Sequence, residues 1–131
     1  MNINKNRSIC IIGLGFVGLT LATVMANGGF KIYGVEKNKF ILKKLKNKKG
    51  HFYEPGLNQN LRKNLKNKKF SFINKIPKNK NISTYIITVG TPLNSQKKVI
   101  TEYIVKTCTE IASVLKDDDI VILQSTVKIG T

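Results

Sequence analysis

The sequence predicts an α/β fold in which helices cover both faces of a doubly wound parallel sheet. Three observations predict it. Several short segments are apolar at consecutive positions, which is typical of strands buried on both faces. Amphipathic helical segments alternate with these strands. A glycine-rich turn joins the first strand directly to the first helix, and right-handed crossovers then give the doubly wound arrangement.

The first strand–helix unit occupies residues 8–29. Residues 8–12 (SICII) are apolar and β-branched, which predicts a short buried strand. The segment FVGLTLATVMANGG follows as a helix, and its two final glycines are expected to end it. Its large apolar residues share one helical face: Val17, Leu21, Val24 and Met25.

The second unit begins with residues 30–36 (FKIYGVE), a predicted strand that ends in a single acid, Glu36. A helix is expected to start after Asn38 and to end at Gly50. A Pro-Gly turn then precedes three leucines at the helical spacing i, i+4, i+8: Leu57, Leu61 and Leu65.

The remaining segments complete the predicted sheet. Residues 70–73 (FSFI) and 83–92 (STYIITVGTP) predict the third and fourth strands, and residues 117–127 predict the fifth. Residues 102–115 predict a helix whose inward side chains are Ile104, Cys108, Ile111 and Leu115. The sequence stops where such a fold begins another helix, so we expect one domain, residues 1–131, truncated before its last helix and strand. We expect it to be a fragment of a longer multidomain enzyme.

The charge is strongly basic, with 23 Lys and Arg against 7 Asp and Glu, a formal net charge of +16. Only Arg7 and Arg62 are arginine, and asparagine is abundant as well. A nucleic-acid surface usually uses arginine to bind phosphate bidentately and interleaves aromatic side chains for stacking. We therefore expect a solvated lysine surface and no specific nucleic-acid partner.

Other bulk features point to the cytoplasm. The polar N-terminus resembles no signal peptide, and apolar runs fall short of the ~20 residues of a membrane span, so no membrane partner is predicted. Cys10 and Cys108 lie far apart in apolar contexts and are expected to be reduced, buried and inert. No metal site is predicted.

The stretch IGLGFVGLTLA contains glycines at the spacing G-x-G-x-x-G between a predicted strand and a helix. Gly13 allows a tight turn, Gly15 lets a pyrophosphate approach the main chain, and Gly18 lets the helix pack closely on the strand. Glu36 ends the second strand, close to the offset expected of the acid that binds the adenosine ribose. These residues predict an NAD site.

Two alternatives to this interpretation stay open. A glycine turn of this kind can be purely structural and bind no ligand. Lys37 and Lys39 flank Glu36 and could neutralise a 2′-phosphate, which would favour NADP over NAD.

Three further motifs follow GLGFVGLTLA in order: KKGHFYEPGL (48–57), VGTPL (89–93) and STVKIGT (125–131). Together they resemble the N-terminal NAD-binding domain of the UDP-glucose/GDP-mannose dehydrogenase family, over essentially the whole chain. The resemblance implies a Rossmann-like domain of a nucleotide-sugar 6-dehydrogenase. Such enzymes oxidise the C6 alcohol of a sugar such as UDP-glucose or a UDP-N-acetylhexosamine to a carboxylate, through a cysteine thioester, for surface-polysaccharide synthesis.

The resemblance also implies roles for individual residues. Phe16 and Val17 would place their backbone amides on the cofactor diphosphate. Thr91, Ser125 and Thr126 follow the fourth and fifth strands, where open α/β sheets bind ligands. Thr126 matches a threonine that helps to organise the catalytic hydrogen-bond network. For Thr91 and Thr126 the alternative is a hydroxyl bonded to local backbone.

This sequence departs from the family pattern beside the predicted ribose site. Glu36 stands where the family mostly has Asp, and Ile41 where it often has Arg or Lys. Lys37 or Lys39 would therefore have to replace that basic residue.

The resemblance places the nucleophilic cysteine and the sugar-binding domains beyond residue 131. We expect this chain alone to bind cofactor without turning over sugar, the nucleotide-sugar substrate to be bound mainly by the missing domains, and the full-length protein to be a homo-oligomer.

His51, the sole histidine, has no partner that the sequence identifies and is not expected to be catalytic. Glu54 could equally cap a helix or have a functional role. The alternative functions are another dehydrogenase of this fold, of hydroxyacid type, and a non-catalytic nucleotide-sensing module.

Overall fold

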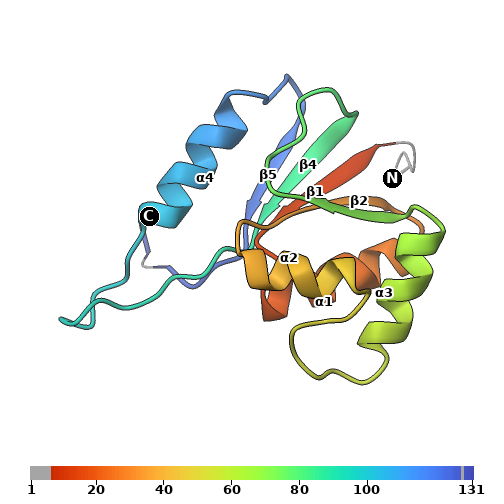
Figure 1. Ribbon diagram of the computed structural model, residues 1–131. Coiled ribbons are helices and arrows are strands. Elements are labelled where there is room, and N and C mark those ends of the chain that lie inside the picture. Colours follow the sequence, from red (N-terminus) through yellow and green to blue (C-terminus); the bar gives the residue numbers. More distant parts are fainter. Residues whose placement is uncertain (1–6, 128) are drawn as a thin grey trace.

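The computed structural model describes residues 7–127 and 129–131, and within them five parallel strands form one sheet (Figure 1). The strands are β1 (Ser8–Ile12), β2 (Lys31–Val35), β3 (Phe70–Ile73), β4 (Ile82–Ile87) and β5 (Ile120–Leu123). Their order across the sheet is β3-β2-β1-β4-β5. The order reverses between β1 and β4, which opens a crevice at the carboxyl ends of these strands. The doubly wound parallel sheet is therefore confirmed.

Helices cover both faces of the sheet. They are α1 (Phe16–Asn27), α2 (Lys39–Lys46), α3 (Leu57–Lys66) and α4 (Glu102–Ala112). Helices α1 to α3 lie on one side of the sheet and α4 lies on the other (Figure 1). Alternate β1 residues enter the two cores, with Ile9 and Ile11 toward α1 and α3, and Cys10 and Ile12 toward α4.

Helix α1 buries a different face from the one formed by its largest apolar residues. Val17 is 50% exposed and Val24 is 59% exposed, so the predicted apolar face was wrong at both positions. The buried residues are mostly small: Gly18, Leu19, Ala22, Thr23 and Ala26. Small side chains allow the helix axis to approach the sheet closely, and this close approach decides which face is buried.

Helices α2 and α4 are shorter than predicted. The Asn38 side chain caps α2 by accepting from the amides of Phe40 and Ile41, as expected, but the helix ends at Lys46 instead of reaching Gly50. Helix α4 ends at Ala112, three residues before its last predicted inward residue.

The inward face of α4 consists of Ile104, Thr107 and Ile111. Cys108 is exposed and Leu115, beyond the end of the helix, is 44% exposed, so both were wrongly predicted to point inward. Cys10 is buried as expected, and this burial raises the pKa of its thiol to about 12, which keeps it protonated and unreactive at neutral pH.

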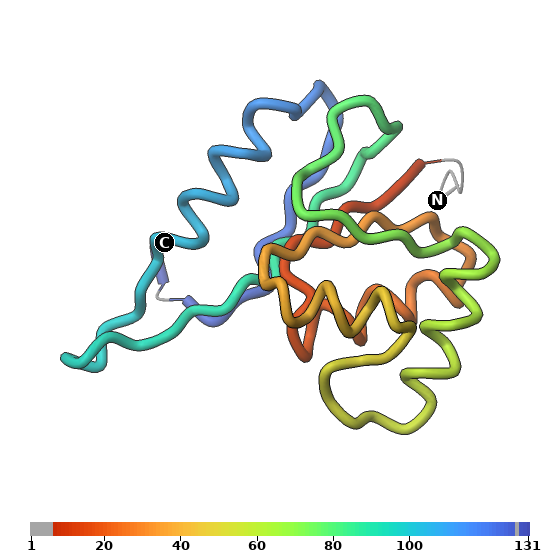
Figure 2. Tube along the Cα trace, viewed as in Figure 1, coloured from red at the N-terminus to blue at the C-terminus, as the bar shows by residue number. Residues whose placement is uncertain are grey.

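The segment between β4 and α4 extends away from the sheet as an arm (Figure 2). An antiparallel bridge between Leu93 and Val99 holds the two sides of the arm together. Among the described residues, no helix is long and apolar enough to cross a membrane.

Candidate cofactor-binding site

The turn between β1 and α1 needs two of its three glycines for structural reasons. Gly13 has a φ of +94°, and a Cβ there would lie 2.9 Å from the Thr88 carbonyl oxygen. Gly18 lies inside α1, and a Cβ there would overlap the carbonyl oxygen of Gly13. Both positions exclude a side chain because the backbone of a neighbouring segment occupies the space.

Gly15 has no such structural reason. Its φ is −69°, which any residue can adopt, and apart from its own chain neighbours no heavy atom of the described chain lies within 4 Å of a Cβ built there. The space beside Gly15 is therefore open to a ligand.

The first turn of α1 offers free donors next to this space. Gly15 is the N-cap of α1, and within the described residues no side chain caps that end and no acid lies in its first turn. The amides of Phe16, Val17 and Gly18 thus point outward from the positive end of the helix dipole, an arrangement that binds anions. This cradle fits a diphosphate.

Thr88, which the sequence interpretation missed, holds the turn in place. Its hydroxyl lies 2.7 Å from the Gly13 carbonyl oxygen and 3.1 Å from that of Ile12, and one hydrogen can be shared between them. The sequence shows that Thr88 is the first polar residue after the apolar end of β4, but its register with the glycine turn comes from the pairing of β4 with β1.

The Glu36 carboxylate binds three backbone amides. Oε2 accepts from Leu14 at 2.8 Å, and Oε1 accepts from Lys37 at 2.9 Å and from Asn38 at 2.8 Å. Glu36 therefore joins the end of β2 to the glycine turn. Because a carboxylate oxygen can accept two hydrogen bonds, Oε2 can still accept one from a ligand hydroxyl.

A cleft of about 360 Å³ lies beside the glycine turn and Glu36, within the range of ligand pockets. Its residues come from β1, β2 and α4 and from the segments that follow β1, β2 and β4: Ile12, Gly13, Gly15, Val35, Glu36, Lys37, Thr88, Val89, Gly90, Pro92, Tyr103, Lys106 and Thr107. The contribution of α4 was not foreseen from the sequence. The cleft brings together an acid for hydroxyl groups, open glycine backbone and two lysines.

The predicted residues after β4 and β5 do not line the cleft. Thr91 is half-buried between Gly90 and Pro92, which do line it. The Ser125 hydroxyl donates to the Val89 carbonyl oxygen at 3.0 Å, and Thr126 is exposed.

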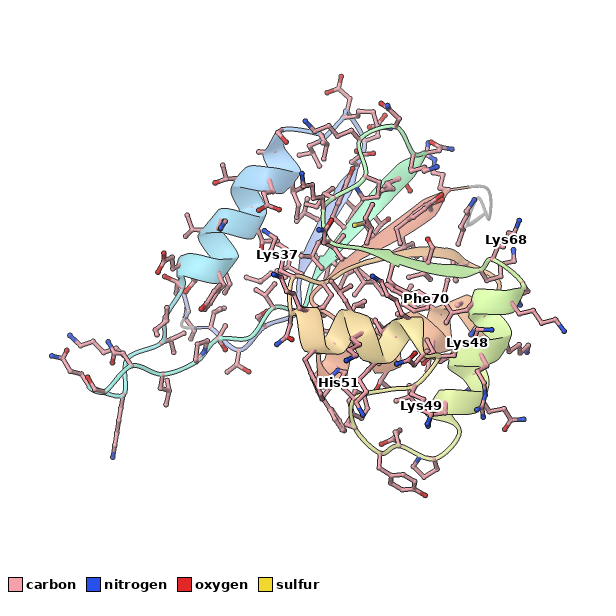
Figure 3. The ribbon with its side chains drawn as sticks, viewed as in Figure 1. Lys37, Lys48, Lys49, His51, Lys68 and Phe70 are labelled. Atoms are coloured by element: carbon pink, nitrogen blue, oxygen red, sulfur yellow. The ribbon has the colours of Figure 1, made fainter. Side chains whose placement is uncertain are left out.

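His51 has a partner that the sequence did not reveal. Its Nε2 lies 2.8 Å from the Leu14 carbonyl oxygen, so the imidazole donates this hydrogen bond. The neighbouring Phe52 ring packs on Phe16 with centroids 4.7 Å apart. These contacts hold the loop between α2 and α3 against the glycine turn (Figure 3). Glu54 is exposed, and α3, whose N-cap is Gly56, has no side-chain cap from any described residue, so the Glu54 side chain does not cap it.

Comparisons with known proteins point to one family. The model described as UDP-glucose/GDP-mannose dehydrogenase family, NAD binding domain, matches residues 7–131. A UDP-N-acetyl-D-mannosamine dehydrogenase of Campylobacter jejuni is 33% identical over 129 residues, which cover 98% of this chain and 31% of the relative. The UDP-glucose 6-dehydrogenase TuaD of Bacillus subtilis is 32% identical over 126 residues, covering 95% of this chain and 27% of the relative.

Solved structures agree with the sequence relatives. A UDP-D-ManNAc dehydrogenase from Pyrococcus horikoshii superposes with a TM-score of 0.87 at 27% identity, covering 94% of this chain and 29% of that one. A GDP-mannose dehydrogenase from Pseudomonas aeruginosa, solved as a ternary complex, gives a TM-score of 0.86 at 27% identity with the same coverage, 94% and 29%. The chain spans about 30% of the length of the curated relatives it matches.

Proposed function

Since the chain belongs to the UDP-glucose/GDP-mannose dehydrogenase family as its NAD-binding domain, we propose that the whole protein oxidises the C6 alcohol of a UDP-sugar to a carboxylate. The substrate class follows from relatives named as dehydrogenases of UDP-N-acetyl-D-mannosamine and UDP-glucose. The observation that carries the proposal is the open space at Gly15, beside the uncapped start of α1 and close to Glu36.

Different residues of this chain bind different parts of NAD. The amides of Phe16 and Val17 hold the diphosphate, and the free acceptor site of Glu36 Oε2 receives a ribose hydroxyl. Lys106 lines the same cleft and adds positive potential for the anionic ligand. Bound NAD supplies the hydride acceptor of the oxidation.

In this proposal the whole protein is as long as its relatives, and the sugar site and the nucleophilic cysteine lie in its further domains. Cys10 is not a candidate nucleophile, since its thiol is buried and its pKa is raised to about 12. Cys108 lies on α4 and is exposed, outside the residues that line the cleft. The proposal includes a homo-oligomeric cytoplasmic enzyme whose product feeds surface-polysaccharide synthesis.

Removing the Glu36 carboxylate should weaken NADH binding. We expect Glu36→Ala to cost about 1–3 kcal/mol, the range for losing a hydrogen bond to a charged group, and to reduce any preference for NADH over NADPH. NADH fluorescence titration measures both affinities. Glu54→Ala, which removes an exposed acid with no role in the cleft, is the matched control. A wild-type chain that binds NADPH more tightly than NADH would contradict the role of Glu36.

Thr126 is proposed to act on the reaction and not on cofactor affinity. It follows β5, whereas Glu36 follows β2, and a dinucleotide lying across the carboxyl edge of the sheet would separate these positions by most of its length. In the whole enzyme Thr126→Ala should lower kcat by about 10–100-fold with little change in the KM for NAD, the pattern expected for an interaction made mainly in the transition state.

Steady-state kinetics of the whole enzyme test this role, with Thr109→Ala as the control, since among the described residues the Thr109 hydroxyl bonds only the backbone of its own helix. An increased KM for NAD with an unchanged kcat would make Thr126 a cofactor contact instead.

A further inference from the structure

One ion pair is present among residues 7–127 and 129–131, and it lies at the edge of the cofactor cleft. The Lys37 ammonium is 2.5 Å from Glu110 Oε1, and the pair joins the turn after β2 to α4. Lys37 is labelled in Figure 3. The sequence has 23 cationic side chains and 7 acids, so there are too few acids to pair with most of the lysines. Lys37 is the residue next to the predicted ribose acid.

The backbone around Lys37 is fixed by that acid. Glu36 Oε1 accepts from the amide of Lys37 itself and from the amide of Asn38. Lys37 lines the cleft, and its side chain reaches α4 at the edge of the cleft, where Glu110 holds the ammonium. Without Glu110, this side chain would be a free cation beside the Glu36 carboxylate.

NADP differs from NAD by a phosphate on the 2′-oxygen of the adenosine ribose, the group expected at Glu36. A free lysine beside this oxygen would attract the phosphate and offset repulsion by Glu36. Resting on the proposed NAD-binding function, we propose that Glu110 is a specificity-determining residue that excludes NADP by holding Lys37. A 2′-phosphate could then recruit Lys37 only by breaking its pair with Glu110.

The expected effect is modest because the pair is partly solvated. The side chains of Lys37 and Glu110 are 54% and 33% exposed, and exposed pairs contribute little to stability. Glu110→Gln should therefore tighten NADPH binding by about three- to tenfold and change NADH binding by less than about twofold. A role of Glu110 in stability alone would change both affinities alike.

Four variants of the 131-residue chain test the proposal by titration with NADH and with NADPH at low ionic strength, where an exposed pair is least screened. They are Glu110→Gln, Lys37→Met, the double variant, and Glu102→Gln as a control acid on the same helix. The gain in NADPH affinity must require Lys37, so the double variant should bind NADPH no better than Lys37→Met. Glu102→Gln should bind both cofactors like the wild type.

Two results would overturn this inference about Glu110 and leave the proposed function standing, provided that the variants still bind NADH. One is an unchanged ratio of NADPH to NADH affinity in Glu110→Gln. The other is an equal gain in the Lys37→Met background, which would show that Glu110 acts by direct repulsion or through Lys106, the other lysine that lines the cleft. Failure of the wild-type chain to bind NADH would instead overturn the proposed function and this inference with it.

Discussion

A Gly15→Val variant should lose NADH affinity by at least about 100-fold, or ~2.7 kcal/mol, and should fold like the wild type. The φ of Gly15 is −69° and, apart from its chain neighbours, no heavy atom of the described residues lies within 4 Å of a Cβ at this position. The valine side chain would enter the open space where the diphosphate approaches the main chain. It would therefore exclude the ligand without straining the free protein.

NADH titration and thermal unfolding of the same samples separate these two effects. Gly28→Ala is the control, because Gly28 lies at the opposite end of the same helix with a φ of −72°. Gly15→Ala, with its smaller side chain, should give an intermediate loss of affinity. Normal NADH binding by Gly15→Val would contradict the diphosphate site.

A Gly18→Ala variant, in contrast to Gly15→Val, should lose stability. A Cβ at Gly18 would overlap the Gly13 carbonyl oxygen and would lie 2.6 Å from the Thr88 hydroxyl. Because the first obstacle is backbone, α1 would have to move away from β1 and the glycine turn. We expect a loss of about 3 kcal/mol or more in the free energy of unfolding, and a melting temperature lower by more than about 10 °C.

Circular dichroism during heating measures this change. Gly15→Ala is the matched control, since it adds the same methyl group three residues earlier, where the space is open. A melting temperature of Gly18→Ala equal to that of the control would show that the helix and the turn are not in the close contact described.

The strands and the glycine turn were predictable from the sequence because both follow from local patterns. Short apolar runs mark the strands, and the spacing of Gly13, Gly15 and Gly18 between a strand and a helix has a direct steric meaning. The buried face of α1 was not predictable from side-chain size. The close approach allowed by Gly18 turns that helix so that Val17 and Val24 face outward.

The site contacts that were missed join segments far apart in the chain. Thr88 bonds Gly13 across 75 residues, and Lys37 bonds Glu110 across 73. Local periodicity carries no information on such pairs, because they depend on how β4 and α4 pack beside β1 and β2. The motif itself gave Gly13 and Gly18 structural roles and Gly15 a role toward a ligand. The structure adds the backbone contacts that exclude a side chain at Gly13 and Gly18, and the open space beside Gly15.

The central claim is that NAD binds along the glycine turn, and backbone amide NMR of this 14.7 kDa chain tests it most directly. Titration with NADH should give saturable shift changes that are largest for the amides of residues 13–19, with further changes at residues 36–38 and 88–91. The basic surface offers another place for an anion, the shallow hollow lined by Lys31, Tyr33 and Phe72. Shifts concentrated at that hollow, or shifts that never saturate, would contradict the claim.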